Sequence, residues 1–430
     1  MVLDRTIVPE IRDFEHLDIP QCRKLTLDNG INLNVLDHGE FDVNRLTMSW
    51  VGGANDVDSF TSLILATDLM REGSELHSGA EIAEILDYSG AWLRNNFHSH
   101  HTTLSLYSLN SKFNDILPIV IESIVSSVFP LHEFEINKEK ISRRKEINLS
   151  KVAYLSNRSN HKLIYGEAHP CSFDESPDDI RDISYDDVKN IHRKVFTPNG
   201  CELFLTGRIS PKVEDQINNQ FGRLMLADET ISHRIIPIQP SSQKEDIITV
   251  SESLQSAITM SIPTISRSNP DYNDLRYTVM ALGGYFGSRL MTNIREDKGY
   301  TYGISSALLG NWEGGVITIS TQCDNNYSMA VIDEIKKEVS NLKKNDFCTD
   351  ELNRLKRFAM TQIAGILDSP FTIMDYYENQ RHVLTSVDYY NQMQQSINLL
   401  TSQRISELAD KYLDINEFRI SIAGNPNNKV

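Results

Sequence analysis

An internal repeat constrains the fold of this chain more than any other feature. A segment that ends at Gly207 recurs without a gap in a segment that ends at Gly424. The aligned pairs are Val188 with Ile405, Ile191 with Leu408, Leu203 with Ile420, and Leu205 with Ile422. Each copy has the pattern of an amphipathic helix, with Ser184 or Thr401 as N-cap, followed by a short alternating strand. Equal spacing through both elements indicates a duplication and therefore two related domains.

The repeat divides the chain into residues 1–226, a linker at 227–245 and residues 246–430. The linker contains Pro237 and Pro240 and few large apolar residues. Strands and helices are segregated in each half rather than strictly alternating. This pattern favours an α+β fold of two homologous domains, each a mainly antiparallel sheet covered by helices.

The clearest local signal is a hairpin at Asp28-Asn29-Gly30, between two runs of alternating residues. The other predicted strands are Leu46–Val51, Thr102–Ser108, Ile247–Ser251, Ser256–Ile262, Tyr302–Leu308 and Gly315–Cys323. The predicted helices are Ser62–Arg71, Ala80–Ser89, Lys112–Phe129 and Phe134–Tyr154, with a long helical stretch from Tyr327 to Leu413.

The formal charge of −17 argues against a nucleic acid or an anionic membrane as partner, because both would repel an acidic surface. The charge is compatible with a basic peptide or a basic partner subunit, and equally with solubility alone. The five cysteines are scattered without a C-x-x-C pair, which predicts neither a disulfide framework nor a thiolate zinc site. The sequence has no secretory signal and no apolar run long enough to span a membrane, so a cytoplasmic protein is expected.

The most specific motif is Gly287-Ser-Arg-Leu-Met-Thr-Asn-Ile-Arg295-Glu-Asp-Lys-Gly299-Tyr-Thr-Tyr302-Gly303. It resembles the C-terminal signature of the insulinase/pitrilysin family of zinc metallopeptidases, the inverzincins, and the resemblance extends over nearly the whole chain. It implies that Arg295 grips a peptide carbonyl or carboxylate and that Tyr302 donates to the oxyanion of a tetrahedral intermediate. A local ion pair of Arg295 and a simple strand-forming role for Tyr302 remain the alternative.

The first half lacks the zinc motif of that family, H-x-x-E-H, in which two histidines bind zinc and the glutamate activates water. When the sequences are aligned on Gly73-Ser74, Ile64 and Asp68 occupy the histidine positions and Thr67 occupies the glutamate position. Isoleucine cannot bind a metal and threonine is a poor general base. No hydrolytic zinc site is therefore predicted, and the chain alone is predicted to be inactive as a peptidase.

Glu139 and Glu146 match the acidic pair that the family carries on a later helix, where one glutamate is the third zinc ligand. Here they could form an oxygen site with Asp68 for a hard cation, or an ordinary helix face paired with Arg143. The run His98-Ser-His100-His101 lies in or beside a predicted strand, where His98 and His100 would share a face. Metal binding, a groove lining and an exposed strand end all remain open for this run.

Three glycines, Gly283, Gly284 and Gly287, precede the arginine–tyrosine motif. The resemblance suggests a short counterpart of the substrate-sensing loop in the non-catalytic subunit of mitochondrial processing peptidase. A tight turn from loop to helix is the simpler interpretation.

The resemblance therefore implies a non-catalytic subunit that binds peptide and supplies Arg295 and Tyr302 in trans to a homologous zinc-bearing subunit. No cofactor is expected in the chain itself, with zinc only in the partner. One alternative is a homodimeric peptide-binding or scaffold protein without proteolytic activity. A second alternative is a peptidase with an unrecognised metal site.

Overall fold

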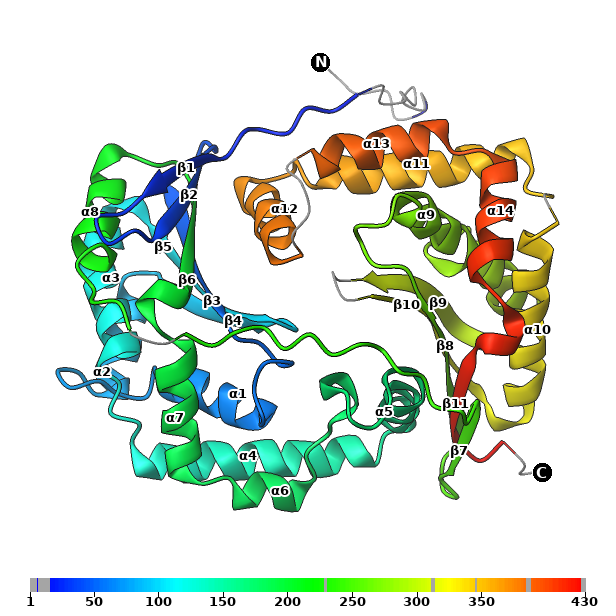
Figure 1. Ribbon diagram of the computed structural model, residues 1–430, viewed down its shortest axis with the longest axis horizontal. Helices are drawn as coiled ribbons and strands as arrows, with labels where there is room; N and C mark the ends of the chain where they lie inside the picture. The colour runs from blue at the N-terminus through cyan, green and yellow to red at the C-terminus, as the bar shows by residue number, and fades with distance from the viewer. Residues whose placement is uncertain are drawn as a thin grey trace.

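A computed structural model describes residue 6 and residues 16–227, 230–310, 314–344, 346–383 and 388–426 of the chain. The linker predicted at 227–245 lies only partly within these ranges. The described chain forms two sheet-and-helix halves that face each other, with a helix of each half extending toward the other (Figure 1).

The first half contains six strands and eight α-helices in the described part of the chain. Its strands are β1 (Arg23–Thr26), β2 (Asn32–Asp37), β3 (Val43–Val51), β4 (Trp92–Phe97), β5 (His101–Leu109) and β6 (Cys201–Gly207). Its helices are α1 (Phe60–Leu69), α2 (Gly79–Tyr88), α3 (Asn110–Val125), α4 (Leu131–Leu149), α5 (Val152–Tyr165), α6 (Pro177–Asp182), α7 (Tyr185–Val195) and α8 (Pro211–Phe221).

The second half follows the same plan. Its strands are β7 (Glu245–Thr249), β8 (Gln255–Thr264), β9 (Thr301–Gly310), β10 (Gly315–Asp324) and β11 (Arg419–Gly424). Its α-helices are α9 (Tyr272–Gly283), α10 (Ser328–Leu342), α11 (Thr349–Gly365), α12 (Pro370–His382), α13 (Tyr389–Leu399) and α14 (Ser402–Tyr412). A π-helical turn, Met291–Asp297, precedes β9.

The two sheets have matching topologies. The first sheet has the order β1-β2-β6-β3-β5-β4, and the second has the order β7-β11-β8-β10-β9. One pair in each sheet is parallel, β2 with β6 and β7 with β11, and the other neighbours are antiparallel. The repeated strands β6 and β11 occupy equivalent places, and both end at a glycine with positive φ, 125° at Gly207 and 150° at Gly424. The predicted class, two α+β domains with mainly antiparallel sheets, is confirmed.

Alternation along the central strands gives each sheet an apolar face and a polar face. On β3, Leu46, Met48 and Trp50 belong to the hydrophobic core of the first half, which α1, α3, α7 and α8 help to build. The odd-numbered residues Arg45, Thr47 and Ser49 are buried on the opposite face. On β8, Ile258, Met260 and Ile262 likewise belong to the core of the second half.

A helix from the other half covers the polar face of each sheet. The α5 helix packs on β8 and β11, where Asn160 donates from its side-chain amide to the carbonyl oxygens of Thr259 (3.1 Å) and Arg419 (2.9 Å). The α12 helix packs on β6 and β2 of the first sheet, and its final residue, His382, hydrogen-bonds Ser49 (2.8 Å). The two halves therefore exchange helices reciprocally (Figure 1).

Most predicted strands lie where expected, but several element boundaries differ. The helix predicted at Phe134–Tyr154 is two helices, because α4 ends at Leu149 and the chain then turns to carry α5 onto the second sheet. The long stretch predicted after Tyr327 is divided into α10 to α14, with the start of α12 set by Pro370. Strand β4 and helices α6, α8 and α9 were not predicted. Among the described segments, no helix has the length and apolar character needed to cross a membrane.

Candidate functional site

The α1 helix occupies the place of the expected zinc-binding helix. Ser59 caps its start by accepting a hydrogen bond from the amide of Ser62. Most of its residues are buried, whereas Ile64 and Asp68, four residues apart on one face, are only partly buried. Thr67 is buried, and its hydroxyl donates to the carbonyl of Leu63 (2.8 Å). This surface therefore presents an aliphatic side chain and one carboxylate, without an imidazole.

The carboxylate of Asp68 is hydrogen-bonded by two neighbouring side chains. Its Oδ1 atom accepts hydrogen bonds from Asn95 on β4 (3.2 Å) and from Arg71 (3.4 Å). On α4, Glu146 is exposed and Glu139 is partly buried, and both turn instead toward α6, where Arg181 pairs with both carboxylates. Arg143 also binds Glu139 at 2.7 Å, and its hydrogen bond is the main reason why the pKa of Glu139 is lowered.

These contacts favour the ion-paired helix face over the oxygen site. Within the described residues, Asp68, Glu139 and Glu146 do not form a group with ligand atoms close enough to share one ion.

Tyr302 lies at the start of β9, an edge strand of the second sheet, and Arg295 lies shortly before that strand. Arg295 belongs to the π-helical turn, and its Nε donates to the backbone carbonyl of Tyr302 (3.1 Å). Its guanidinium also lies 4.8 Å from the ring centre of Phe286. The nearest contact with Glu296, 3.8 Å from Nη1 to Oε1, is longer than the hydrogen bond to Tyr302. The side chain of Tyr302 is 93% exposed, so its phenol is available to a partner or a ligand. π-Helical turns are rare and are frequent at functional sites.

The three glycines do not form one continuous loop. Gly283 is the last residue of α9 and is buried against β9, where a Cβ atom would lie 2.8 Å from Ser306 Oγ. Gly284 caps α9, and a Cβ there would meet Met280 within the same helix. A Cβ at Gly287 would lie 3.0 Å from the ring of Tyr285. Close packing thus accounts for Gly283 and Gly284, and any contact of these glycines with a substrate stays a prediction.

The histidine run lies at the turn between β4 and β5, and the prediction that His98 and His100 share a strand face is wrong. Strand β4 ends at Phe97 and β5 begins at His101, so the chain reverses direction between them. His100 is buried and its Nδ1 contacts Asp56 Oδ1 at 2.9 Å. The ring of His98 instead lies 5.2 Å from that of His382.

Two further histidines join this cluster, His233 from the segment before β7 and His382 from the end of α12. The ring of His101 lies 4.3 Å from that of His382 and 5.2 Å from that of His233. Burial lowers the pKa of His101 to about 3 and holds the pKa of His382 well below its ordinary value. Both rings are therefore neutral at neutral pH. No local pattern marks His233 or His382, because the partners lie far apart in the sequence.

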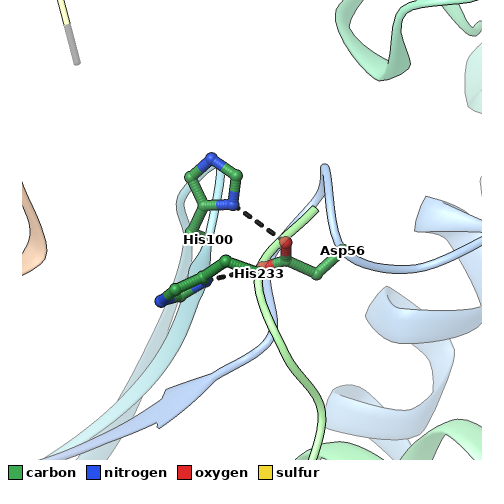
Figure 2. Close-up of side chains that lie close together, drawn as sticks. All are labelled: Asp56, His100 and His233. Carbon is green, nitrogen blue, oxygen red and sulfur yellow. Dashed lines mark hydrogen bonds and ion pairs between the residues drawn. The ribbon is translucent and has the colours of Figure 1, made fainter. Parts of the chain in front are cut away.

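Asp56 is the charged centre of the cluster (Figure 2). Its side chain is fully buried, and its oxygens accept from the backbone amides of Arg234 (2.8 Å) and Gly53 (3.2 Å). Burial opposes ionisation of this carboxyl, but the hydrogen bonds from His100 and from the two amides outweigh it and lower the pKa. The cluster thus holds a buried carboxylate among imidazoles from three distant segments.

Comparisons with known proteins agree with this architecture. Residues 182–358, from α6 to α11, match the family described as the peptidase M16 inactive domain. An uncharacterised zinc protease of Bacillus subtilis (strain 168), YmxG, is 21% identical over 405 residues, which cover 90% of this chain and 94% of that protein.

Solved structures show the same fold over nearly the full length. The peptidase M16 inactive domain from Pseudomonas fluorescens superposes with a TM-score of 0.84 at 20% identity, over 94% of this chain and 98% of that one. A protease from Helicobacter pylori gives a TM-score of 0.82 at 14% identity, with coverages of 95% and 100%. A chain of Complex III2 from Candida albicans gives 0.74 at 11% identity, with coverages of 94% and 96%. Residues 182–358 thus match the peptidase M16 inactive domain, and the described chain has the two-domain fold of these solved structures.

Proposed function

We propose that this chain is a non-catalytic subunit of a zinc-peptidase assembly. It binds peptide and supplies Arg295 and Tyr302 to the active site of a homologous, zinc-bearing subunit. The observation that carries the proposal is an asymmetry between the halves: α1 presents Ile64, Thr67 and Asp68 where a zinc peptidase needs two histidines and a glutamate, whereas the arginine–tyrosine motif at the start of β9 is intact.

The geometry around Tyr302 supports a role in trans. Its phenol is exposed, and the hydrogen bond from Arg295 to its backbone carbonyl ties the two residues together. An exposed phenol can donate to an oxyanion that forms on a peptide held by another subunit. The guanidinium of Arg295, stacked on Phe286, keeps donors that can bind a peptide carbonyl or carboxylate.

The test combines the purified chain with a zinc-competent homologue from the same source and follows cleavage of a quenched fluorescent peptide. We expect this chain alone to be inactive and the mixture to cleave. Tyr302→Phe should lower kcat by about 10²–10³-fold, because one oxyanion donor is lost. Arg295→Ala should lower kcat/KM by about tenfold or more, because a charge-assisted hydrogen bond to the peptide is lost.

Tyr300→Phe is the matched control, since Tyr300 is two residues away and its ring stacks on Tyr327 (4.5 Å between ring centres). This variant should retain the kcat of the wild-type mixture. An inactive mixture, or activity that ignores both Arg295→Ala and Tyr302→Phe, contradicts the proposal. If the chain instead forms a symmetric homodimer that binds the peptide without cleavage, the scaffold alternative replaces it.

A further inference from the structure

Three residues from distant parts of the chain meet at a point that the proposed function does not use. Asp56 precedes α1, His100 lies in the β4–β5 turn, and His233 lies between α8 and β7 (Figure 2). Nδ1 of His100 is 2.9 Å from Oδ1 of Asp56, and Nδ1 of His233 is 3.4 Å from Oδ2. Each residue offers one ligand atom, and the three atoms lie within 4.8 Å of one another.

Backbone groups around Asp56, His100 and His233 hold the three side chains in place. The amides of Arg234 and Gly53 fix the two carboxylate oxygens of Asp56. Gly53 also lets the histidine turn approach, because a Cβ there would lie 2.3 Å from the carbonyl oxygen of His98. Such outer hydrogen bonds orient the ligands of known metal sites and tune their affinity.

The spacing and chemistry of the donors suit a transition metal. Zinc binds imidazole nitrogen and carboxylate oxygen at about 2.0–2.2 Å, which places two ligands of a tetrahedral ion about 3.4 Å apart. The observed separations are near this value, at 2.9 Å from His100 Nδ1 to Oδ1 and 3.4 Å from His233 Nδ1 to Oδ2. All three ligand atoms lie within 4.8 Å of one another, so the rings must move toward one oxygen of Asp56 to share an ion. Imidazole ligands favour zinc, copper and nickel over magnesium and calcium, which prefer oxygen.

An ion can reach the site from the surface. The side chains of Asp56 and His100 are 0% and 3% exposed, but that of His233 is 25% exposed. A cavity of about 850 Å³ adjoins the site, and Asp56 and Arg234 contribute to its wall. Further carboxylates line the same cavity, namely Asp58, Glu175, Asp179, Asp182 and Asp187, and they outnumber its cations, Arg193, Lys194 and Arg234. The excess of carboxylates favours cations in this cavity.

We propose that Asp56, His100 and His233 bind one divalent transition-metal ion of the zinc type. The ion replaces the hydrogen bonds between the two Nδ1 atoms and the carboxylate, and the neutral imidazoles carry their protons on Nε2. Because His233 belongs to the segment between the halves, the ion fastens that segment to the first half. The site is separate from Ile64, Thr67 and Asp68, so it gives this chain no hydrolytic centre, and its failure leaves the proposed function intact.

The test titrates the untagged full-length chain, freed of metal by a chelator, with Zn²⁺ alone in a calorimeter. We expect one ion per chain in the wild type and affinity at least about tenfold weaker in His233→Ala, which removes the most exposed ligand. His77→Ala is the matched control, since His77 also contacts a carboxylate, that of Glu122, at 3.0 Å, and it should bind zinc like the wild type.

A second measurement needs no variant. Zinc should protect His233, the most exposed ligand, from acylation by diethyl pyrocarbonate in the wild-type chain, read by peptide mass spectrometry. The absence of stoichiometric binding, equal affinity in the wild type and a folded His233→Ala variant, or binding without protection of His233 would each overturn the site.

Discussion

At the scale of single residues, the contact between the halves centres on Arg45. Its side chain is 4% exposed, and its guanidinium pairs with Asp375 (2.5 Å) and Glu378 (2.8 Å) of α12. Burial raises the pKa of Glu378 to about 7, although the charge of Arg45 opposes the shift. Replacing a buried ion pair by apolar residues is often neutral for stability, so we expect these pairs to act mainly on how α12 docks.

The raised pKa of Glu378 makes a testable contribution to the free energy of unfolding. The folded state binds more protons than the unfolded state between the unfolded pKa of 4.5 and the folded pKa of about 7. This stabilisation is complete below the unfolded value and is lost as the pH rises through the folded value. Urea unfolding at about pH 5 and about pH 8 should therefore show the advantage of the wild type over Glu378→Gln falling by up to about 3 kcal/mol.

Glu417→Gln is the control for this experiment. The hydrogen bond from Lys244 lowers the pKa of Glu417, so any pH dependence that this carboxylate contributes has the opposite sign. An advantage of wild type over Glu378→Gln that rises with pH would show that Arg45 outweighs burial.

At the scale of secondary-structure elements, the exchanged helices are held by polar contacts rather than by apolar packing alone. On α5, Asn160 bonds two backbone carbonyls and also accepts from the hydroxyl of Ser261 (2.5 Å). Ser156 meets the hydroxyl of Thr259 (2.9 Å). These groups are buried, so each depends on its partner for a hydrogen bond.

Asn160→Ala should therefore lower the free energy of unfolding by about 1–3 kcal/mol, because buried carbonyls lose their donor. The measurement is the urea midpoint, compared at an unchanged dependence on denaturant. Asn199 offers a matched control: its amide also makes two hydrogen bonds, both to the backbone of Ala227, but at the exposed surface. Asn199→Ala should cost about 0.5 kcal/mol or less. Equal losses in the two variants would refute the importance of the α5 contact.

The sequence predicts the helices and strands better than it predicts which of them pack against one another. Alternation marked the strand at Leu46–Val51, since its even-numbered apolar residues repeat with period two. The same alternation could not show that Arg45 faces a helix from the other half, because the pairing depends on tertiary contacts. Strand β4 was missed because Arg94, Asn95 and Asn96 dilute the strand pattern.

In the candidate site too, the sequence predicted the residues of continuous motifs but not those that only tertiary structure brings together. Motif spacing located Arg295, Tyr302 and the positions at Ile64, Thr67 and Asp68, all of which lie within continuous segments. The Asp56–His100–His233 group joins three separate segments, and nothing local to His233 signals its partners.

At the scale of the whole molecule, the exchange of α5 and α12 couples the two halves. Neither sheet has both faces covered by its own half, so neither half is expected to retain its structure once the other unfolds. Urea unfolding of the full chain should therefore show one transition. Far-UV circular dichroism, which reports both halves, should share its midpoint with tryptophan fluorescence, to which Trp50 in the first core contributes. Two separated midpoints would show that the halves unfold independently.

The reciprocal helices also bear on what a proteolytic nick would do. A cut between α8 and β7 separates the polypeptide into two fragments. The first fragment carries α5, which covers the second sheet, and the second fragment carries α12, which covers the first sheet. Such fragments complement one another, so the nicked protein would give two bands on a denaturing gel yet migrate as a single particle under native conditions.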